Sequence, residues 1–227
     1  YYFEMEWEKR GRTGHWPMFH RFGREYSQSH LPVREQTTAE GHSVRAVYMY
    51  TGMADIAAET GDVELYEACE RLWNNIVSRR MYITGGIGSV SHGEAFTFDY
   101  DLPNDTVYAE TCASIGLIFF ARRMLEIEAK GRYADVMERA LYNTVISGMS
   151  LDGKRFFYVN PLEVWPEASE KSPVKQHVKV TRQKWFGCAC CPPNLARMLT
   201  SLGEYIYTVN EKAVYMNLYI GGEAQVE

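Results

Sequence analysis

Three of the five cysteines in this 227-residue chain lie within four positions, in the stretch Gly-Cys-Ala-Cys-Cys-Pro-Pro-Asn at residues 187–194. Adjacent Cys190 and Cys191 make a poor disulfide, because the small ring would strain the peptide between them. Both thiolates can instead bind one soft metal ion, and zinc accepts thiolates together with a carboxylate or imidazole at the corners of a tetrahedron. The two prolines favour a helix start, so the cluster is expected on a loop just before a helix.

A second segment offers the remaining ligands. Cys112 follows Glu110 by two positions, just ahead of an apolar run at residues 113–125 that predicts a helix. On a regular helix this spacing points the two side chains apart, so they can share an ion only from extended chain or an irregular first turn. The hypothesis is a zinc site made of Glu110, Cys112, Cys190 and Cys191. The alternative is that Cys112 is a small buried hydrophobe and Glu110 a first-turn carboxylate, while Cys69 is a core residue.

Helical periodicity dominates most of the chain and favours paired helices. Two helical hairpins are predicted, over residues 39–60 with 63–80 and over 108–129 with 133–149. A short strand is predicted over residues 155–158 and a last helix over 193–208. Residues 1–38 are predicted to be loop and short irregular structure, and 169–184 a polar loop. Repeated hairpins with long loops at one end indicate an all-α toroid whose helix starts surround a central pocket.

Composition and the ends of the chain limit the alternatives. A hydrophobic content of 46% suffices for a sizeable core, and the net charge of -5 argues against nucleic acid as a partner. No apolar stretch is long enough to span a membrane, so no membrane partner is expected. The first residue is not methionine, and residues 215–220 resemble a strand that begins a new element. We therefore expect an interior piece of a longer protein, and free cysteines favour a cytoplasmic, reducing location.

The glycine-rich segment at residues 81–104 carries the most conspicuous isolated carboxylate. Its glycines lack the Lys-Ser/Thr ending of a phosphate-binding loop, which argues against a nucleotide site. Glu94 in this segment stabilises no helix and has no evident core role, so it is a candidate functional residue. His42, Glu138 and Tyr158 are further polar candidates whose elements would converge at the mouth of a barrel. Taken singly, Glu138 fits a solvated helix face equally well, and Tyr158 fits the core.

Several motifs together resemble glycoside hydrolase family 127, the β-L-arabinofuranosidase family. They are Gly-Gly-Ile-Gly at 85–88, Gly-Glu-Ala-Phe at 93–96, Leu-Pro-Asn at 102–104, Tyr-Ala-Glu-Thr-Cys-Ala at 108–113 and Cys-Ala-Cys-Cys-Pro-Pro-Asn at 188–194. The likeness covers nearly the whole chain, and the motifs are highly specific. It implies a catalytic (α/α)6 barrel followed by β-sandwich domains. Residues 1–212 would be the C-terminal part of the barrel, and residues 213–227 the beginning of a β-rich domain.

The resemblance also implies the roles of the site residues. Zinc would be held by Glu110, Cys112, Cys190 and Cys191. Cys190 would be the nucleophile and Glu94 the general acid/base, and His42, Glu138 and Tyr158 match positions that hold the sugar.

The expected activity is retaining hydrolysis that releases L-arabinofuranose from β-L-arabinofuranosides of plant glycans. One alternative is a hydrolase for another rare plant-polysaccharide sugar, and the other is a non-catalytic carbohydrate-binding module with a structural zinc. A barrel needs about twice the helices predicted here, so the chain alone is expected to be weakly active or inactive. A homodimer is expected only through domains beyond this chain.

Overall fold

The computed structural model describes residues 5–6, 9–10 and 21–225. Residues 1–4, 7–8, 11–20 and 226–227 lie outside the described residues, so the irregular structure predicted for 1–38 falls partly outside them. Over residues 21–38 that prediction is confirmed, because regular structure there is limited to two α-helical residues at 21–22 and the short 3-10 helices η1 (Arg24–Ser27) and η2 (Val33–Glu35).

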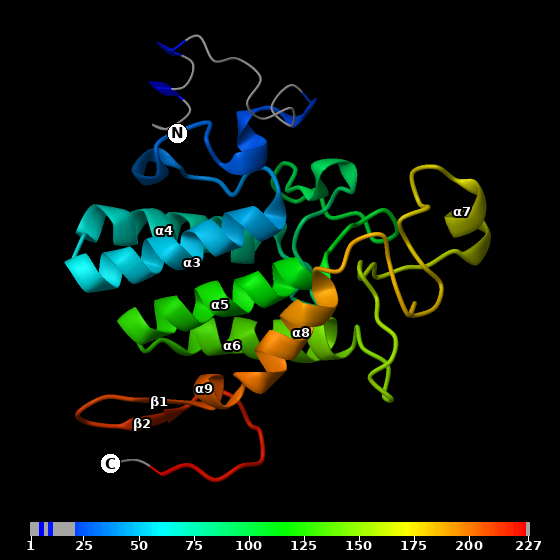
Figure 1. Ribbon diagram of the computed structural model, residues 1–227. Coiled ribbons are helices and arrows are strands. Elements are labelled where there is room, and N and C mark those ends of the chain that lie inside the picture. The colour runs from blue at the N-terminus through cyan, green and yellow to red at the C-terminus, as the bar shows by residue number, and fades with distance from the viewer. Residues whose placement is uncertain (1–4, 7–8, 11–20, 226–227) are drawn as a thin grey trace.

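Two helical hairpins form the body of the described chain (Figure 1). They consist of α3 (Ser43–Thr60) with α4 (Val63–Asn75), and α5 (Thr111–Ile127) with α6 (Gly131–Ala140). The first turn places Gly61 at φ 67°, a left-handed conformation that glycine adopts at little cost. Asp62 then caps α4 by accepting a hydrogen bond of 2.9 Å from the Leu65 amide. Both predicted hairpins are confirmed, although α3 and α5 begin a few residues later than expected.

The core is centred on α5, which is apolar around most of its circumference and packs against α3 on one side and α6 on the other. The helices α3 and α5 approach closely because Gly116 has no side chain. A Cβ atom at Gly116 would lie 2.5 Å from Val47 Cγ2 and 2.9 Å from Tyr48 Cε2. The close crossing therefore fixes the relative position of the two helix starts.

Both outer helices, α4 and α6, end in a π-helical turn, at Ile76–Arg80 and Leu141–Ile146 respectively. These turns hold more residues than an α-helical turn and are frequent next to functional sites. The helices predicted over 63–80 and 133–149 are thus helical through most of their length, but not as regular α-helices. Each π-turn lies at the end of its hairpin where the long loops gather (Figure 1).

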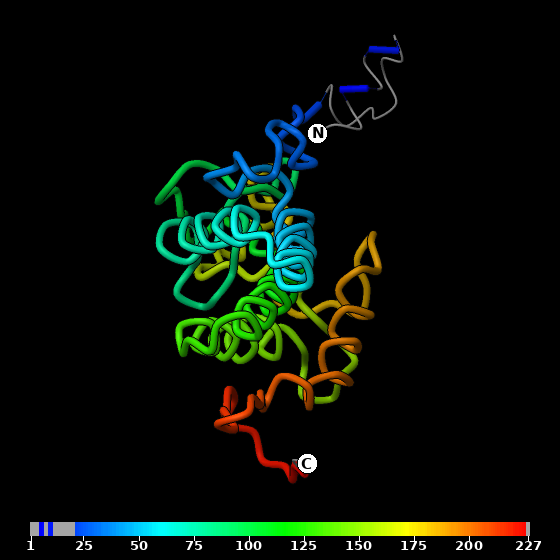
Figure 2. Tube along the Cα trace, turned by 90° about the vertical axis from the view of Figure 1, so that its left-hand side faces the viewer, coloured from blue at the N-terminus to red at the C-terminus, as the bar shows by residue number. Residues whose placement is uncertain are grey.

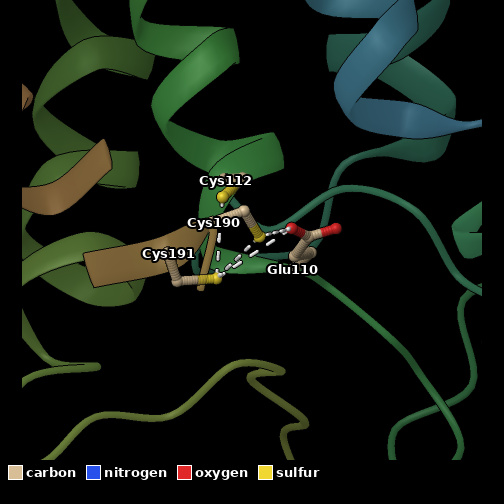
Figure 3. A group of neighbouring side chains, drawn as sticks. All are labelled: Glu110, Cys112, Cys190 and Cys191. Carbon is tan, nitrogen blue, oxygen red and sulfur yellow. Dashed lines mark hydrogen bonds between the residues drawn. The ribbon is translucent and has the colours of Figure 1, made fainter. Parts of the chain in front are cut away.

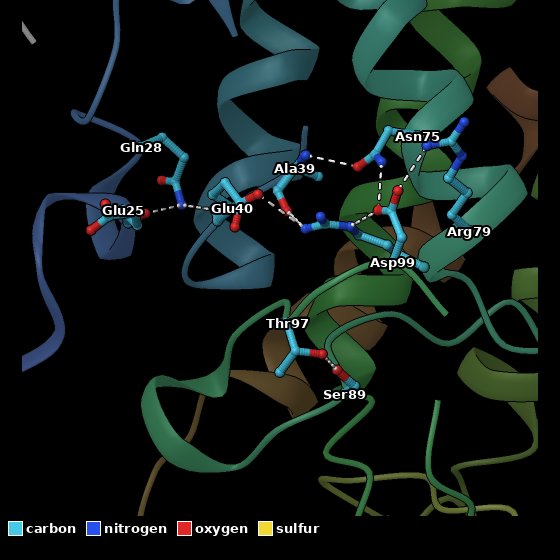
Figure 4. Close-up of polar contacts among 10 residues, drawn as sticks. Glu25, Gln28, Ala39, Glu40, Asn75, Arg79, Ser89, Thr97 and Asp99 are labelled. Carbon is cyan, nitrogen blue, oxygen red and sulfur yellow. Dashed lines mark hydrogen bonds and ion pairs between the residues drawn. The ribbon is translucent and has the colours of Figure 1, made fainter. Parts of the chain in front are cut away.

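A polar network ties the glycine-rich segment to the first hairpin (Figure 4). Asp99 accepts hydrogen bonds from Asn75 Nδ2 at 2.9 Å, from Arg79 at 2.8 Å and from Arg80 Nε at 2.8 Å. The guanidinium of Arg80 is buried and also donates to the Ala39 carbonyl at 2.6 Å. Hydrogen bonds from Arg79 and then Arg80 hold the pKa of Asp99 down at about 2.

The segment between the second hairpin and α8 is mainly loop, with the short helix α7 (Pro166–Lys171) inside it. The strand predicted over 155–158 is wrong. Phe156 alone makes isolated bridges there, to Met149 and to Gln183. A tight turn with Gly153 at φ 67° immediately precedes these residues, and the chain does not stay extended long enough to pair further.

The single helix predicted over 193–208 is also wrong. The chain forms α8 (Cys191–Thr200), one turn of α9 (Gly203–Ile206) and then a hairpin of β1 (Tyr207–Val209) with antiparallel β2 (Val214–Met216). The Tyr-Thr-Val sequence of β1 favours extended chain. The strand predicted over 215–220 is shorter and begins one residue earlier. The boundary predicted between residues 212 and 213 falls inside the turn of this hairpin, and a β-rich domain beyond it stays a prediction.

The described chain is therefore mostly helical with a small antiparallel sheet, which confirms the helical class. Its layers follow the order of the sequence, from the N-terminal segment through the two hairpins to the sheet (Figure 2). Among the described residues, no helix combines the length and apolarity that crossing a bilayer requires.

Candidate active site

Three helix starts converge at the loop end of the hairpins and bring the predicted site residues together. His42 precedes α3, Glu110 precedes α5, and Cys190 precedes α8, each as the last residue before its helix. Cys112 and Cys191 lie in the first turns of α5 and α8. Glu110 has an extended backbone, with φ -61° and ψ 137°, so it leaves the helical path and can face the same point as Cys112. The irregular start that shared ligation requires is thus present.

The side chains of Glu110, Cys112, Cys190 and Cys191 form one compact cluster (Figure 3), and their donor atoms all lie within 4.8 Å of one another. The sulfur atoms of Cys112 and Cys191 are 3.6 Å apart, and those of Cys190 and Cys191 are 3.8 Å apart. Glu110 Oε1 lies 3.2 Å from the sulfur of Cys190 and 3.9 Å from that of Cys191. These sulfurs belong to free thiols, not disulfides.

The cluster fits a metal ion with tetrahedral coordination. Thiolates bound to zinc at about 2.3 Å lie about 3.8 Å apart along a tetrahedron edge, close to the observed sulfur separations. Burial, with the Cys190 charge next, raises the pKa of Glu110 to about 9, and its Oε2 atom is buried without a hydrogen-bond partner in the described residues. A buried carboxyl that lacks partners is costly, and a cation would supply the missing one.

Cys190 differs from the other two clustered thiols in both exposure and electrostatics. Its side chain is partly exposed, whereas Cys112 and Cys191 are buried. Hydrogen bonds from Cys112, from Cys191 and from Tyr158 lower the pKa of Cys190, while the pKa values of Cys112 and Cys191 are raised. The Tyr158 hydroxyl lies 3.0 Å from the sulfur of Cys190. Of the clustered thiols, Cys190 is therefore the one best suited to contact a bound ligand in its deprotonated, thiolate form.

Glu94 lies in the glycine-rich segment with a strained backbone. Its φ is 52° and that of Gly93 is 70°, left-handed values that a glutamate rarely adopts. The segment is held against α3, because Ala95 forms isolated bridges with His42 and Val90, and Ser43 Oγ donates to the Glu94 carbonyl at 3.0 Å. The strain therefore belongs to a loop that its neighbours hold in one conformation.

His42 and Tyr108 contact the Glu94 carboxylate at different oxygens, and a carboxylate oxygen of Glu110 lies within 4.8 Å of it. His42 Nε2 lies 3.0 Å from Oε2, and the Tyr108 hydroxyl donates to Oε1 at 3.1 Å. Burial acts to raise the pKa of Glu94, but the hydrogen bond and charge of His42, with the Tyr108 hydrogen bond, outweigh it and lower that pKa. This direction is the opposite of the one that burial alone would give. The donors, rather than the apolar walls, decide the charge of Glu94.

A cavity of about 310 Å³ opens beside these groups. Its lining includes Glu94, Tyr108 and Tyr158 on the side of the cluster, and His177 and Phe186 on the loop that carries the cysteines. Burial lowers the pKa of His177, whose Nε2 lies 3.2 Å from the Thr106 carbonyl. The cavity thus places a carboxylate and aromatic rings around one space, as a sugar-binding site requires.

The structure places all but one of the predicted site residues close together at the loop end of the hairpins. Glu138 is exposed on α6, and in the described part of the chain no hydrogen bond or ion pair links its side chain to another candidate. Its predicted contact with a sugar stays a prediction. Tyr108 and His177 were missed. For Tyr108 the available signal was its position two residues before Glu110, whereas no local pattern distinguishes His177.

Residues 8–204 match the family model of the β-L-arabinofuranosidase GH127 catalytic domain. The chain belongs to the GH127 family. The resemblance inferred from the motifs is therefore confirmed.

Individual GH127 relatives agree with this assignment. A non-reducing end β-L-arabinofuranosidase of Bifidobacterium longum subsp. longum is 50% identical over 202 residues, which are 88% of this chain and 30% of that protein. The crystal structure of a GH127 β-L-arabinofuranosidase from Geobacillus stearothermophilus T6 is 62% identical, has a TM-score of 0.89, and is matched over 97% of this chain and 34% of that one. A second GH127 β-arabinofuranosidase structure is 51% identical, with a TM-score of 0.79 over 86% of this chain and 29% of that one. The chain thus spans about a third of the length of these relatives.

Proposed function

We propose that this chain carries the catalytic centre of a retaining glycoside hydrolase that releases L-arabinofuranose from β-L-arabinofuranosides. Membership of GH127 and relatives with that activity in their names support the substrate class. The observation that carries the proposal is the position of Cys190. It is the partly exposed thiol of the cluster, and its pKa is lowered.

The metal is proposed to be zinc. Three thiols and a carboxylate form a donor set that suits zinc better than the harder magnesium or calcium ions. Glu110, Cys112, Cys190 and Cys191 would hold it, and the bound ion would keep the sulfur atoms deprotonated. In this proposal the site is catalytic rather than only structural, because Cys190 is partly exposed and its sulfur lies 3.0 Å from the hydroxyl of Tyr158, which lines the cavity together with Glu94.

The proposed reaction has two displacement steps. In the first, the sulfur of Cys190 attacks the anomeric carbon as the glycosidic C–O bond breaks. Glu94, which has to take up a proton beforehand because its pKa is lowered, gives that proton to the leaving oxygen. In the second, Glu94 takes a proton from water, the water oxygen attacks the same carbon, and the C–S bond breaks to return the thiolate. His42 and Tyr158, which touch Glu94 and Cys190, are proposed to hold the sugar between them.

The larger architecture also remains a proposal. Two packed hairpins with their loops at one end are compatible with part of an (α/α)6 barrel, whose remaining helices would come from outside this chain. Such a part leaves the pocket open on one side, so we propose weak activity for the isolated chain. A β-sandwich beyond residue 213, a homodimer through such domains and a cytoplasmic location are likewise proposals.

Replacement of the two reacting groups tests the function. Cys190→Ser is expected to keep the circular dichroism spectrum yet lose hydrolysis of 4-nitrophenyl β-L-arabinofuranoside by at least about 100-fold. Glu94→Gln is expected to lose turnover while retaining its zinc, which separates an enzyme from a carbohydrate-binding module with a structural zinc. Cys69→Ala, a buried cysteine on α4, serves as the matched thiol control. Unchanged hydrolysis by Cys190→Ser would reject the nucleophile.

A panel of furanosides distinguishes the second candidate function. If another rare plant sugar is the substrate, its aryl glycoside will be cleaved with a higher kcat/KM than the L-arabinofuranoside. The same Cys190→Ser and Glu94→Gln variants should then lose that activity too, because the chemistry depends on the same two groups.

A further inference from the structure

We propose that Asn160 is a positioning residue, which holds Ala109 in a left-handed backbone conformation and so directs Glu110 into the metal cluster. This inference rests on the proposed function, because Glu110 is one of the candidate zinc ligands. Asn160 itself makes no hydrogen bond to any of the four candidate ligands within the described residues. Its task is to fix the chain from which one of them extends.

The backbone of Ala109 is strained at the position immediately before Glu110. Its φ is 41°, in the left-handed region that a residue with a β-carbon disfavours by about tenfold. Ala109 is fully buried, and its methyl group packs with Tyr82 and Val107. Strain of this kind persists only where the surrounding structure over-determines the conformation, and it is concentrated at functional sites. Contacts from the neighbouring chain must therefore hold Ala109 in place.

Asn160 makes those contacts on both sides of Glu110. Its Nδ2 atom has two hydrogens, and it donates to the Ala109 carbonyl at 3.0 Å and to Thr111 Oγ1 at 3.0 Å. Its backbone amide also points at the Ala109 carbonyl, at 3.2 Å, but shares its hydrogen with the Tyr108 carbonyl at 3.3 Å. The side-chain amide thus supplies the shorter bond to Ala109 and the bridge across Glu110.

The peptide that joins Ala109 to Glu110 depends on this interaction. The Ala109 amide donates to the Gly88 carbonyl at 2.8 Å, which fixes the preceding peptide. Among the described residues, the hydrogen bonds to the carbonyl of the following peptide come from Asn160 alone. A return of Ala109 from φ 41° to about -60° would turn the chain after it by about 100°. Glu110 would then leave the cluster.

The carboxyl group of Glu110 tolerates little rotation. Its Oε1 atom lies 3.2 Å from the sulfur of Cys190 (Figure 3), and its Oε2 atom is buried without a hydrogen-bond partner in the described chain. A metal ion supplies the missing partner only while this carboxyl group faces the three sulfurs. Replacing the residues that orient a metal ligand lowers metal affinity by about 10- to 100-fold.

Zinc affinity measured in two backgrounds tests the proposal. Asn160→Ala is expected to raise the Kd for zinc by about 10- to 100-fold, in competition titrations with a chromophoric chelator. Glycine adopts the left-handed conformation readily, so Ala109→Gly should keep the wild-type Kd and make the side chain of Asn160 largely dispensable. In the Ala109→Gly background, Asn160→Ala is therefore expected to raise the Kd by less than about fivefold.

Asn210→Ala is the matched control, because the side chain of Asn210 also holds a turn. Its Oδ1 atom accepts from the amides of Lys212 and Ala213 at 2.9 Å in the β1–β2 hairpin, and within the described residues it bonds to no candidate site residue. This control should leave the Kd for zinc unchanged. If Asn160→Ala does not fold, Asn160→Asp takes its place with the same expectation, because it keeps the side-chain volume and lacks the donor.

The possible outcomes separate this role from others. An equal rise of the Kd in both backgrounds would assign Asn160 to general folding and overturn the proposal. An unchanged Kd in Asn160→Ala, or failure of both Asn160 variants to fold, would overturn it as well. A wild-type chain that binds no zinc would instead reject the proposed metal site, and this role with it, so the two failures are distinguishable.

Discussion

A methyl group added at Gly116 should destabilise the protein, although alanine is the better helix former. The Cβ atom would lie 2.5 Å from Val47 Cγ2, and an ordinary contact needs about 3.4 Å, so α3 and α5 must separate by about 0.9 Å. Overpacking a core costs about 1–3 kcal/mol, and replacing helical glycine by alanine returns up to about 1 kcal/mol. We therefore expect the free energy of unfolding of Gly116→Ala to fall by about 1–2 kcal/mol.

Gly52 on α3 is the matched control, because a Cβ atom there meets nothing within 4 Å. Gly52→Ala should raise the free energy of unfolding by about 0.5–1 kcal/mol through helix propensity alone. Urea titrations followed by circular dichroism at 222 nm measure both variants against the wild-type chain. If Gly116→Ala proves as stable as Gly52→Ala, the close crossing of α3 and α5 does not constrain the fold as argued.

Two further predictions concern the metal cluster and the Asp99 network. The purified chain should bind one zinc ion per molecule, and free zinc at about 1,000 times its Kd should raise the free energy of unfolding by about 4 kcal/mol. Cys191→Ser should abolish this gain and Cys69→Ala should keep it, as metal analysis with thermal melts will show; equal melts with and without zinc would contradict the site. Asp99→Asn should cost about 2–3 kcal/mol near neutral pH, because buried Arg80 loses its main partner. The folded pKa of Asp99, about 2, lies below the usual 3.8, so this cost should shrink as pH falls from 4 toward 2, and a constant difference in urea titrations would refute the ion-pair account.

Sequence reasoning predicted the elements that depend on local pattern. The hairpins follow from apolar periodicity and from the turn residues Gly61 and Asp62, which act within a few positions. It failed where distant contacts or an abrupt change decided the outcome. Phe156 meets Met149 and Gln183 only singly, so a segment with strand-like composition forms no strand. After Thr200 the helical pattern gives way within a few residues to a β-hairpin, a change that periodicity over a long window averages away.

Part of the candidate site could also be predicted from local sequence, and part could not. Cys190 and Cys191 were recognisable from their spacing, and Glu110 from its place before a predicted helix. The geometry around Glu94 was not predictable, because the groups that decide its charge come from separate segments. His42 lies far ahead of it in the chain and Tyr108 follows it, and only the folded loop brings each to one carboxylate oxygen. The pKa of Glu94 is therefore lowered, although burial alone would raise it.

The π-turn at Ile76–Arg80 sets the direction in which the chain leaves α4 and enters the glycine-rich segment. If these five residues wound as ordinary α-helix, at about 100° a residue instead of about 82°, Arg80 would turn by about 90° about the helix axis. The guanidinium of Arg80 would swing away from Asp99, and the glycine-rich loop would leave the helix in a different direction. The wide turn at the end of α4 thus helps to set the position of the loop that carries Glu94.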